Sequence, residues 1–243
     1  MEIKLPTKIE SQVIELNHSQ IVVSSCYPGY GTTLGNALRR ILLSSMPGAA
    51  AFAVRIKGVD HEFSTIKNVK EDVLEIILNI KKLCFKVFSD EEIELNLKVR
   101  GKKEITAADF EKNAEVEAVN KEQKIATLTD KAAELDLKLS IRNGRGYVPV
   151  ELREKEKLPV GYIAIDAIYT PIKNVNFKIE HVRVEQMTNY DKLILDIVTD
   201  GTLSPEEAFV EACQILMDHF SSLKESMVIE KVDKKKKYAA QKK

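Results

Sequence analysis

Hydrophobic and polar residues alternate along several stretches of the chain, which predicts half-buried β-strands. The alternation is clearest at residues 93–99, 135–141, 175–179 and 193–197. Successive side chains of a strand point to opposite faces, so this period places one face in a core. Shorter strands are expected at 13–16, 21–23, 50–57, 124–129 and 162–169. The chain is therefore predicted to be rich in strands.

Three segments instead carry helical spacing, at residues 34–45, 72–83 and from 204 to about 222 or beyond. We expect Thr32 or Thr33 to cap the first helix and Pro47-Gly48 to end it. The third helix has the clearest start, since Ser204-Pro-Glu-Glu207 combines an N-cap Ser with Glu at the third helical position.

Strands and helices do not alternate in a βαβ order, so the predicted class is α+β. The polar segment 101–123 reads as loops, and Asn143-Gly-Arg-Gly146 reads as a turn.

Charge is unevenly distributed, although the chain as a whole has 37 basic and 37 acidic residues. Residues 231–243 hold seven Lys and one Asp, so the rest of the chain is slightly acidic. Duplex DNA binding needs basic charge and single-strand binding usually needs aromatic platforms, which make up only 6% of this chain. We expect the lysine segment to be a flexible, solvated tail, with nucleic-acid or lipid contact as the less favoured alternative.

Three widely spaced cysteines and the absence of an apolar leader or a long apolar run favour a reducing, cytoplasmic setting without membrane contact. No zinc-ligand spacing, paired histidine motif or nucleophile motif is present, so the sequence predicts no metal, no cofactor and no catalytic residue. The glycine-rich loop before the first helix matches neither nucleotide-binding pattern, and a tight turn with positive φ is the favoured interpretation.

The first helix carries Leu43 beside Arg39 and Arg40, off its apolar stripe. Arginine next to an apolar anchor is typical of protein interfaces, and the residues alone leave an interface and an ordinary surface equally open.

A collinear set of motifs resembles the alpha subunit of bacterial RNA polymerase. It begins with Thr33-Leu-Gly-Asn-Ala-Leu-Arg-Arg-Ile-Leu-Leu-Ser-Ser-Met-Pro-Gly48. Further matches are Gly58-Val-Asp-His-Glu-Phe-Ser-Thr65, Glu71-Asp-Val-Leu-Glu-Ile-Ile-Leu-Asn79, Gly144-Arg-Gly-Tyr-Val-Pro149, Val184-Glu-Gln-Met-Thr188 and Asp200-Gly-Thr-Leu-Ser-Pro-Glu-Glu-Ala208.

The resemblance implies two subdomains: a discontinuous helix-plus-sheet dimerisation domain, residues 1–47 and 171–230, and an inserted strand-rich domain, residues 48–170. It implies a homodimer whose interface is formed by the first and last long helices. The residues expected there are Leu34, Leu38, Ile41, Leu42, Phe209, Ala212, Ile215, Leu216 and Leu223.

The resemblance further implies a non-catalytic scaffold that nucleates assembly of the beta and beta-prime subunits of this nucleotidyltransferase. Arg39, Arg40, Leu43 and Lys81 are the expected large-subunit contacts. DNA would be met only through the assembled complex, since the promoter-contacting carboxy-terminal domain of the family is not matched. The alternatives are a nucleic-acid-binding or regulatory dimer outside the polymerase and a free-standing enzyme.

Overall fold

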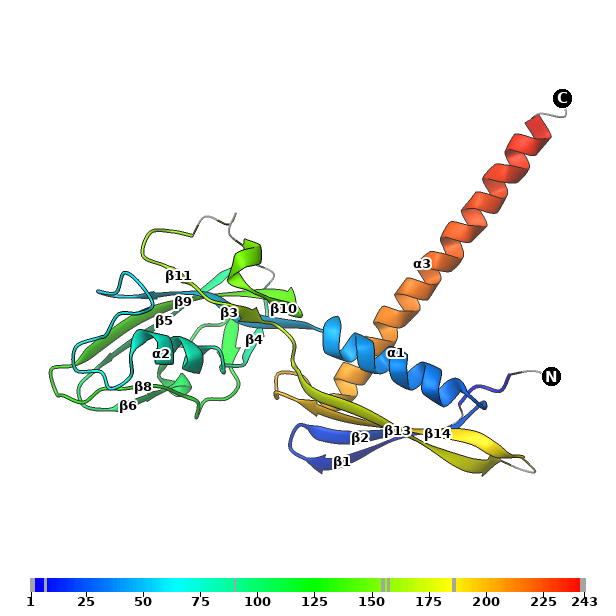
Figure 1. Cartoon of the computed structure of the whole chain (residues 1–243), viewed down its shortest axis with the longest axis horizontal. Coiled ribbons are helices and arrows are strands. Elements are labelled where there is room, and N and C mark those ends of the chain that lie inside the picture. Colours follow the sequence, from blue (N-terminus) through cyan, green and yellow to red (C-terminus); the bar gives the residue numbers. More distant parts are fainter. Residues whose placement is uncertain are drawn as a thin grey trace.

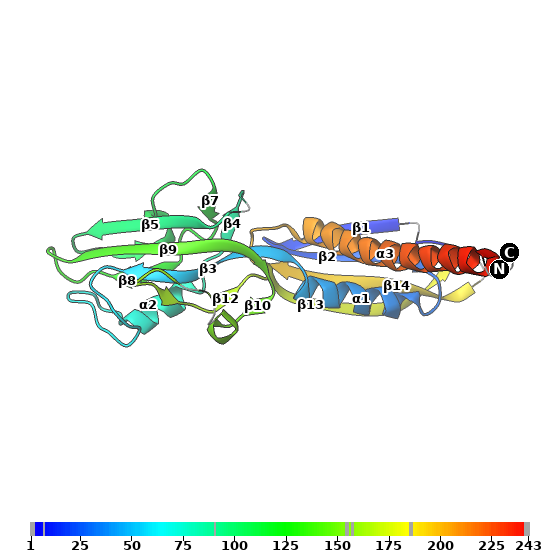
Figure 2. The ribbon, with the colours of Figure 1, turned by 90° about the horizontal axis from the view of Figure 1, so that it is seen from above.

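The chain forms two bodies lying end to end, with one long helix projecting from the junction side (Figure 1). The computed structural model describes residues 3–6, 8–89, 91–153, 156, 158–184 and 187–240. The split body is built from the two ends of the sequence, and the central body from the segment between them. Figure 2 shows the same elongated arrangement from above.

The split body is a four-stranded antiparallel sheet in the order β1-β2-β14-β13, covered on one face by two helices. Its elements are β1 (Lys8–Glu15), β2 (His18–Cys26), α1 (Tyr30–Ser44), β13 (Ile172–Val184), β14 (Met187–Thr199) and α3 (Pro205–Ala240). The predicted alternation is confirmed here, because inward residues such as Leu193, Leu195 and Ile197 are fully buried. Helices α1 and α3 pack on this apolar face (Figure 2).

The central body has its own apolar core. A six-stranded sheet holds β3 (Pro47–Ile56), β4 (Phe85–Val87), β5 (Ile93–Arg100), β7 (Val116–Ala118), β9 (Glu134–Arg145) and β11 (Ile163–Ala164). Two small strand pairs are β6 (Glu104–Thr106) with β8 (Lys124–Thr127), and β10 (Tyr147–Val148) with β12 (Ala167–Ile168). Helix α2 (Val73–Ile80) and short turns η1 (Ala107–Asp109) and η2 (Val150–Arg153) complete it.

Mixed helices and antiparallel sheets confirm the predicted α+β class. The buried residues fall into one large cluster for each body and a small third cluster where β3 meets β12. Among the described residues, no helix is long and apolar enough to cross a membrane.

Several local predictions were wrong. Segment 101–123 contains β6, η1 and β7 in place of loops alone. Residues 143–145 continue β9, paired with residues 47–49, so only Gly146, with φ 66°, makes the turn. The strand expected at 162–169 breaks between β11 and β12, because Asp166 there accepts bonds from Lys81 and from the Val150 amide.

Helix α3 begins where the sequence predicted. Ser204 Oγ accepts from the Glu207 amide at 3.2 Å, and Glu207 Oε2 accepts from the Ser204 amide at 3.0 Å. This reciprocal cap satisfies two helix-end donors. The helical backbone continues to Ala240, through most of the segment that we expected to be a tail from Lys231. Residues 241–243 lie outside the described residues.

Candidate functional site

The start of α1 is fixed by a residue far away in the sequence. Asp191 Oδ2 accepts from the amides of Gly29, at 2.9 Å, and Gly31, at 3.1 Å. Gly29 has φ 84°, and a Cβ on Gly31 would lie 2.8 Å from the Asp191 Cβ, so the loop needs both glycines. The predicted N-cap at Thr32 or Thr33 was therefore wrong, because a buried carboxylate from β14 supplies the cap.

This anchoring sets which face of α1 is exposed. Leu38 and Leu42 are buried against the sheet, whereas Arg39, Arg40 and Leu43 are exposed, Leu43 by 42%. The Ser44 hydroxyl donates to the carbonyl oxygen of Arg40 at 2.7 Å. The end of α1 thus presents two guanidinium groups and one apolar side chain to solvent.

Lys81, the remaining predicted contact residue, follows α2 in the central body. Its Nζ lies 2.8 Å from Asp166 Oδ2, and both side chains are about three-quarters buried. The Lys81 hydrogen bond, followed by that from the Val150 amide, holds the pKa of Asp166 below its ordinary value. Lys81 is therefore half of a partly buried ion pair joining α2 to the β11–β12 region, and not a free surface cation.

The structure links the end of α1 to this ion pair. A Cβ on Gly146 would lie 3.6 Å from the Ser44 carbonyl oxygen, so the two backbones are adjacent. The hydroxyl of the next residue, Tyr147, faces Asp166, whose negative charge helps to raise the pKa of Tyr147 after the larger effect of desolvation. Exposed large apolar side chains on the neighbouring elements are Leu74 and Leu78 of α2, Tyr147 of β10, Leu152 of η2 and Ile168 of β12. We call these five residues, with Arg39, Arg40, Leu43 and Lys81, the docking surface.

The predicted dimer residues divide into two groups. Leu38, Leu42, Ala212 and Ile215 lie in the core of a single protomer, so they have almost no surface to give to a partner. They fasten α1 and α3 to their own sheet, and their part in a dimer interface stays a prediction. Those that keep exposed surface are Leu34, Ile41, Phe209, Leu216 and Leu223.

Sequence analysis assigned Phe209, Leu216 and Leu223 of α3 to an interface but missed the longer apolar seam that contains them. Phe209, Cys213, Leu216, Phe220, Leu223 and Met227 are spaced alternately by four and three residues. This is the spacing of a helix that packs against another helix along its length. Phe220, Leu223 and Met227 are each 66% exposed, because every residue from 217 to 227 is exposed in the protomer. We call the six residues the α3 seam.

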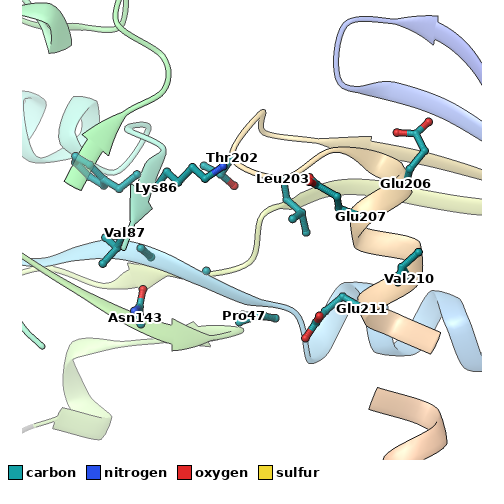
Figure 3. Close-up of a pocket in the computed structure, with 13 residues that line it drawn as sticks. Pro47, Lys86, Val87, Asn143, Thr202, Leu203, Glu206, Glu207, Val210 and Glu211 are labelled. Carbon is teal, nitrogen blue, oxygen red and sulfur yellow. The ribbon is translucent and has the colours of Figure 1, made fainter. Parts of the chain in front are cut away.

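A cleft of about 800 Å³ lies between the bodies, beside the base of α3 (Figure 3). Figure 3 shows Glu207, Val210 and Glu211 on one wall and Lys86, Val87 and Asn143 on the other. Glu207 already caps α3 through Ser204, and Glu206 accepts from the hydroxyl of Ser11. The acidic wall therefore serves the local fold, and in the described part of the chain no His, Cys, Asp and Glu cluster could hold a metal.

The histidines do not bring together a reactive group. His18 Nε2 lies 2.9 Å from Asp196 Oδ1 on the open sheet face. His181 Nδ1 lies 3.4 Å from Asp191 Oδ1, but this carboxylate is committed to the amides that begin α1. Each of these two histidines is therefore paired with an aspartate that takes part in the local fold.

Comparison with known families bears on the central body. Residues 54–170 match the family model described as the RNA polymerase Rpb3/RpoA insert domain. The match supports an RNA polymerase subunit of the alpha/Rpb3 type. The matched insert domain covers nearly all of the central body, including Lys81, Asp166 and Tyr147. Helices α1 and α3 lie outside it.

Proposed function

We propose that this chain is the bacterial-type alpha assembly subunit of DNA-directed RNA polymerase, a non-catalytic scaffold. Two copies would pair through the split body, the dimerisation domain, and each copy would bind one large subunit, beta or beta-prime. The single observation that carries the proposal is the match of the central body to the Rpb3/RpoA insert domain. DNA would be met only by the complete polymerase.

The docking surface supports the second half of this proposal. The end of α1 and Lys81 after α2 are linked by a series of contacts through Gly146, Tyr147 and Asp166. The arginines of this surface and Tyr147 are of the residue types that contribute most binding free energy at interfaces. An arginine fork can meet a carboxylate while the apolar neighbours exclude water.

The α3 seam supports homodimerisation. The side chains of Phe220, Leu223 and Met227 on this projecting helix are left exposed by the part of its own protomer that the structure describes. A two-fold axis would bring the same seam from a second copy against it, together with the exposed parts of Leu34 and Ile41. The interface proposed is thus the predicted set without its four core residues, extended along α3.

Co-expression with the beta subunit tests the docking surface. Arg40→Ala should reduce the amount of beta captured by about tenfold, which corresponds to a typical interface anchor. Leu43→Asp should have a similar effect, because it places a charge in an apolar contact. The dimer should persist in both variants, since neither side chain is in the α3 seam.

Arg55→Ala is the matched control, because Arg55 is also an exposed arginine but lies on the central body away from the docking surface. Capture should be unchanged in that variant. Wild-type capture of beta by Arg40→Ala and Leu43→Asp together would refute the proposed contact.

A further inference from the structure

The two bodies are joined by two chain connections that touch each other. The first runs from α1 into β3 through Pro47 and Gly48, and the second leaves β12 through Tyr169 and Pro171. A Cβ on Gly48 would lie 1.9 Å from the Tyr169 carbonyl oxygen and 3.3 Å from Pro171 Cδ. Only glycine at position 48 allows the connections to approach so closely.

The ring, the backbone amide and the hydroxyl of Tyr169 all make contacts where the two connections cross. Its ring covers Gly144, where a Cβ would lie 2.7 Å from three ring carbons. Gly144 is also the direct cross-strand partner of Gly48, so the two glycines form one bare patch on the β3–β9 ladder. An aromatic ring laid over strand glycines restores the packing that they lack. Tyr169 is accordingly only 3% exposed.

Tyr169 is also held by hydrogen bonds. Its amide donates to the Gly146 carbonyl oxygen at 2.8 Å, and its hydroxyl accepts from Arg142 Nε at 2.9 Å. Arg142 is itself held by Glu156, at 3.1 Å, and lies over the Phe52 ring, 4.5 Å from its centroid. The residue that ends the central body is thus fixed to strand β9 at residues 142 and 144 and to Gly146, the turn residue that follows the strand.

We propose that Tyr169 is a positioning residue, a clasp that fixes the central body relative to α1 and so gives the docking surface one geometry before any partner arrives. The docking surface needs this, because Arg40 and Leu43 belong to the split body and Lys81 to the central body. Bodies joined by two connections and a small interface move relative to one another by default. A surface already in its bound geometry binds more tightly, because less ordering remains to be done.

The inference rests on the proposed function only for the identity of the partner. The clasp itself is tested on the isolated full chain by hydrogen–deuterium exchange. We expect the amides of residues 45, 46, 48 and 49 and of residues 169, 170 and 172 to be protected in the wild type, Pro47 and Pro171 having no amide hydrogen. In Tyr169→Ala they should exchange about tenfold faster, while peptides from the β9 and β14 cores keep their protection. Tyr169→Phe keeps the ring and should show a smaller increase.

Tyr162→Phe is the matched control for Tyr169→Phe, since it removes a tyrosine hydroxyl from the same apolar cluster, but this hydroxyl donates to Glu94 at 2.7 Å and has no bond to Arg142. It should leave exchange at both connections unchanged. Unprotected connections in the wild type would overturn the clasp. So would an increase in Tyr169→Ala that spreads through the whole central body, because this would indicate an ordinary core residue.

Capture of the beta subunit separates the clasp from the proposed function. Tyr169→Ala should reduce capture by about tenfold with the dimer intact, and Tyr169→Phe should restore most of it. Arg40→Ala should reduce capture without changing exchange. Faster exchange in Tyr169→Ala with normal capture overturns the positioning role, whereas normal capture in Arg40→Ala defeats the proposed contact and leaves the exchange result standing.

Discussion

Asp191 shows how one side chain can organise a surface that it does not touch. Its carboxylate is buried and binds the two amides that begin α1, the helix that carries Arg40 and Leu43 at its other end. A buried carboxylate at a helix N-terminus satisfies free amides and complements the positive end of the helix dipole. The orientation of the docking surface therefore depends on a residue of β14.

Removing this carboxylate should destabilise the protein. Asp191→Ala should lower the free energy of unfolding by about 1–3 kcal/mol, because the part-buried hydrogen bond to Gly29 and the buried one to Gly31 are both lost. Urea unfolding followed by circular dichroism would measure it. Asp196→Ala is the control on the same strand, since Asp196 lies on the open face with 31% of its side chain exposed. An equal loss in both variants would contradict the capping role.

Glu71 should make stability depend on pH. Burial alone raises its pKa, but hydrogen bonds from Lys124 and from the amide and hydroxyl of Thr127 outweigh this effect and leave the pKa below its ordinary value of 4.5. A carboxyl whose pKa is lowered by folding stabilises the protein above its unfolded pKa, and this contribution is lost as the pH falls through the folded pKa.

Glu71→Gln should therefore be less stable than the wild type at pH 7, and the difference should shrink as the pH falls below about 4.5. Urea titrations at a series of pH values would measure this difference in the free energy of unfolding between the two proteins. Glu117→Gln is the exposed control and should differ little from the wild type at any pH, because its partner Lys121 is also well exposed. A stability difference between the wild type and Glu71→Gln that does not change with pH would contradict the pH-dependent contribution of Glu71.

Among the elements, those set by nearby residues could be predicted from the sequence. The cap of α3 involves Ser204 and Glu207, three positions apart, and it was found correctly. The cap of α1 involves residues 160 positions apart, and a single sequence does not show that pairing. The strand at 162–169 failed for the same reason, because Lys81 and Val150 hold Asp166 out of a continuous ladder. The candidate site followed the same division: exposed Arg40 and Leu43 could be read from the helix pattern, whereas the ion pair of Lys81 could not.

Helix α3 yields a prediction about self-association. Phe220 and Leu223 are each 66% exposed, so replacing both with Asp should leave the protomer folded and remove the apolar contact between copies. Light scattering at micromolar concentration should give a dimer for the wild type and a monomer for Phe220→Asp with Leu223→Asp. Val160→Asp, at a position 99% exposed on the central body, should remain dimeric. A monomeric wild type would refute the proposed homodimer.

The proposed two-fold dimer predicts the subunit stoichiometry of the assembled complex. A two-fold dimer presents the same docking surface twice, and two different large subunits can occupy the two copies. Native mass spectrometry of the complex co-expressed with beta and beta-prime should therefore show two copies of this chain with one of each partner. Arg40→Ala should accumulate as the free dimer. A complex with one copy of each chain would contradict this arrangement.

The pairing of β2 with β14 has a consequence for the order of folding. Ile21 of β2 lies opposite Leu195 of β14, so the nascent β1–β2 hairpin and α1 cannot complete their sheet until the ribosome has made β14. The central body can fold in the meantime from its own core. Once it has folded, it brings residues 48 and 169 together. The two halves of the split sheet are then no longer separated by an unfolded loop of about 120 residues. Most of the entropic cost of closing that loop has therefore been met before the sheet forms. We therefore expect co-translational maturation from the middle outward, with the two ends joining last.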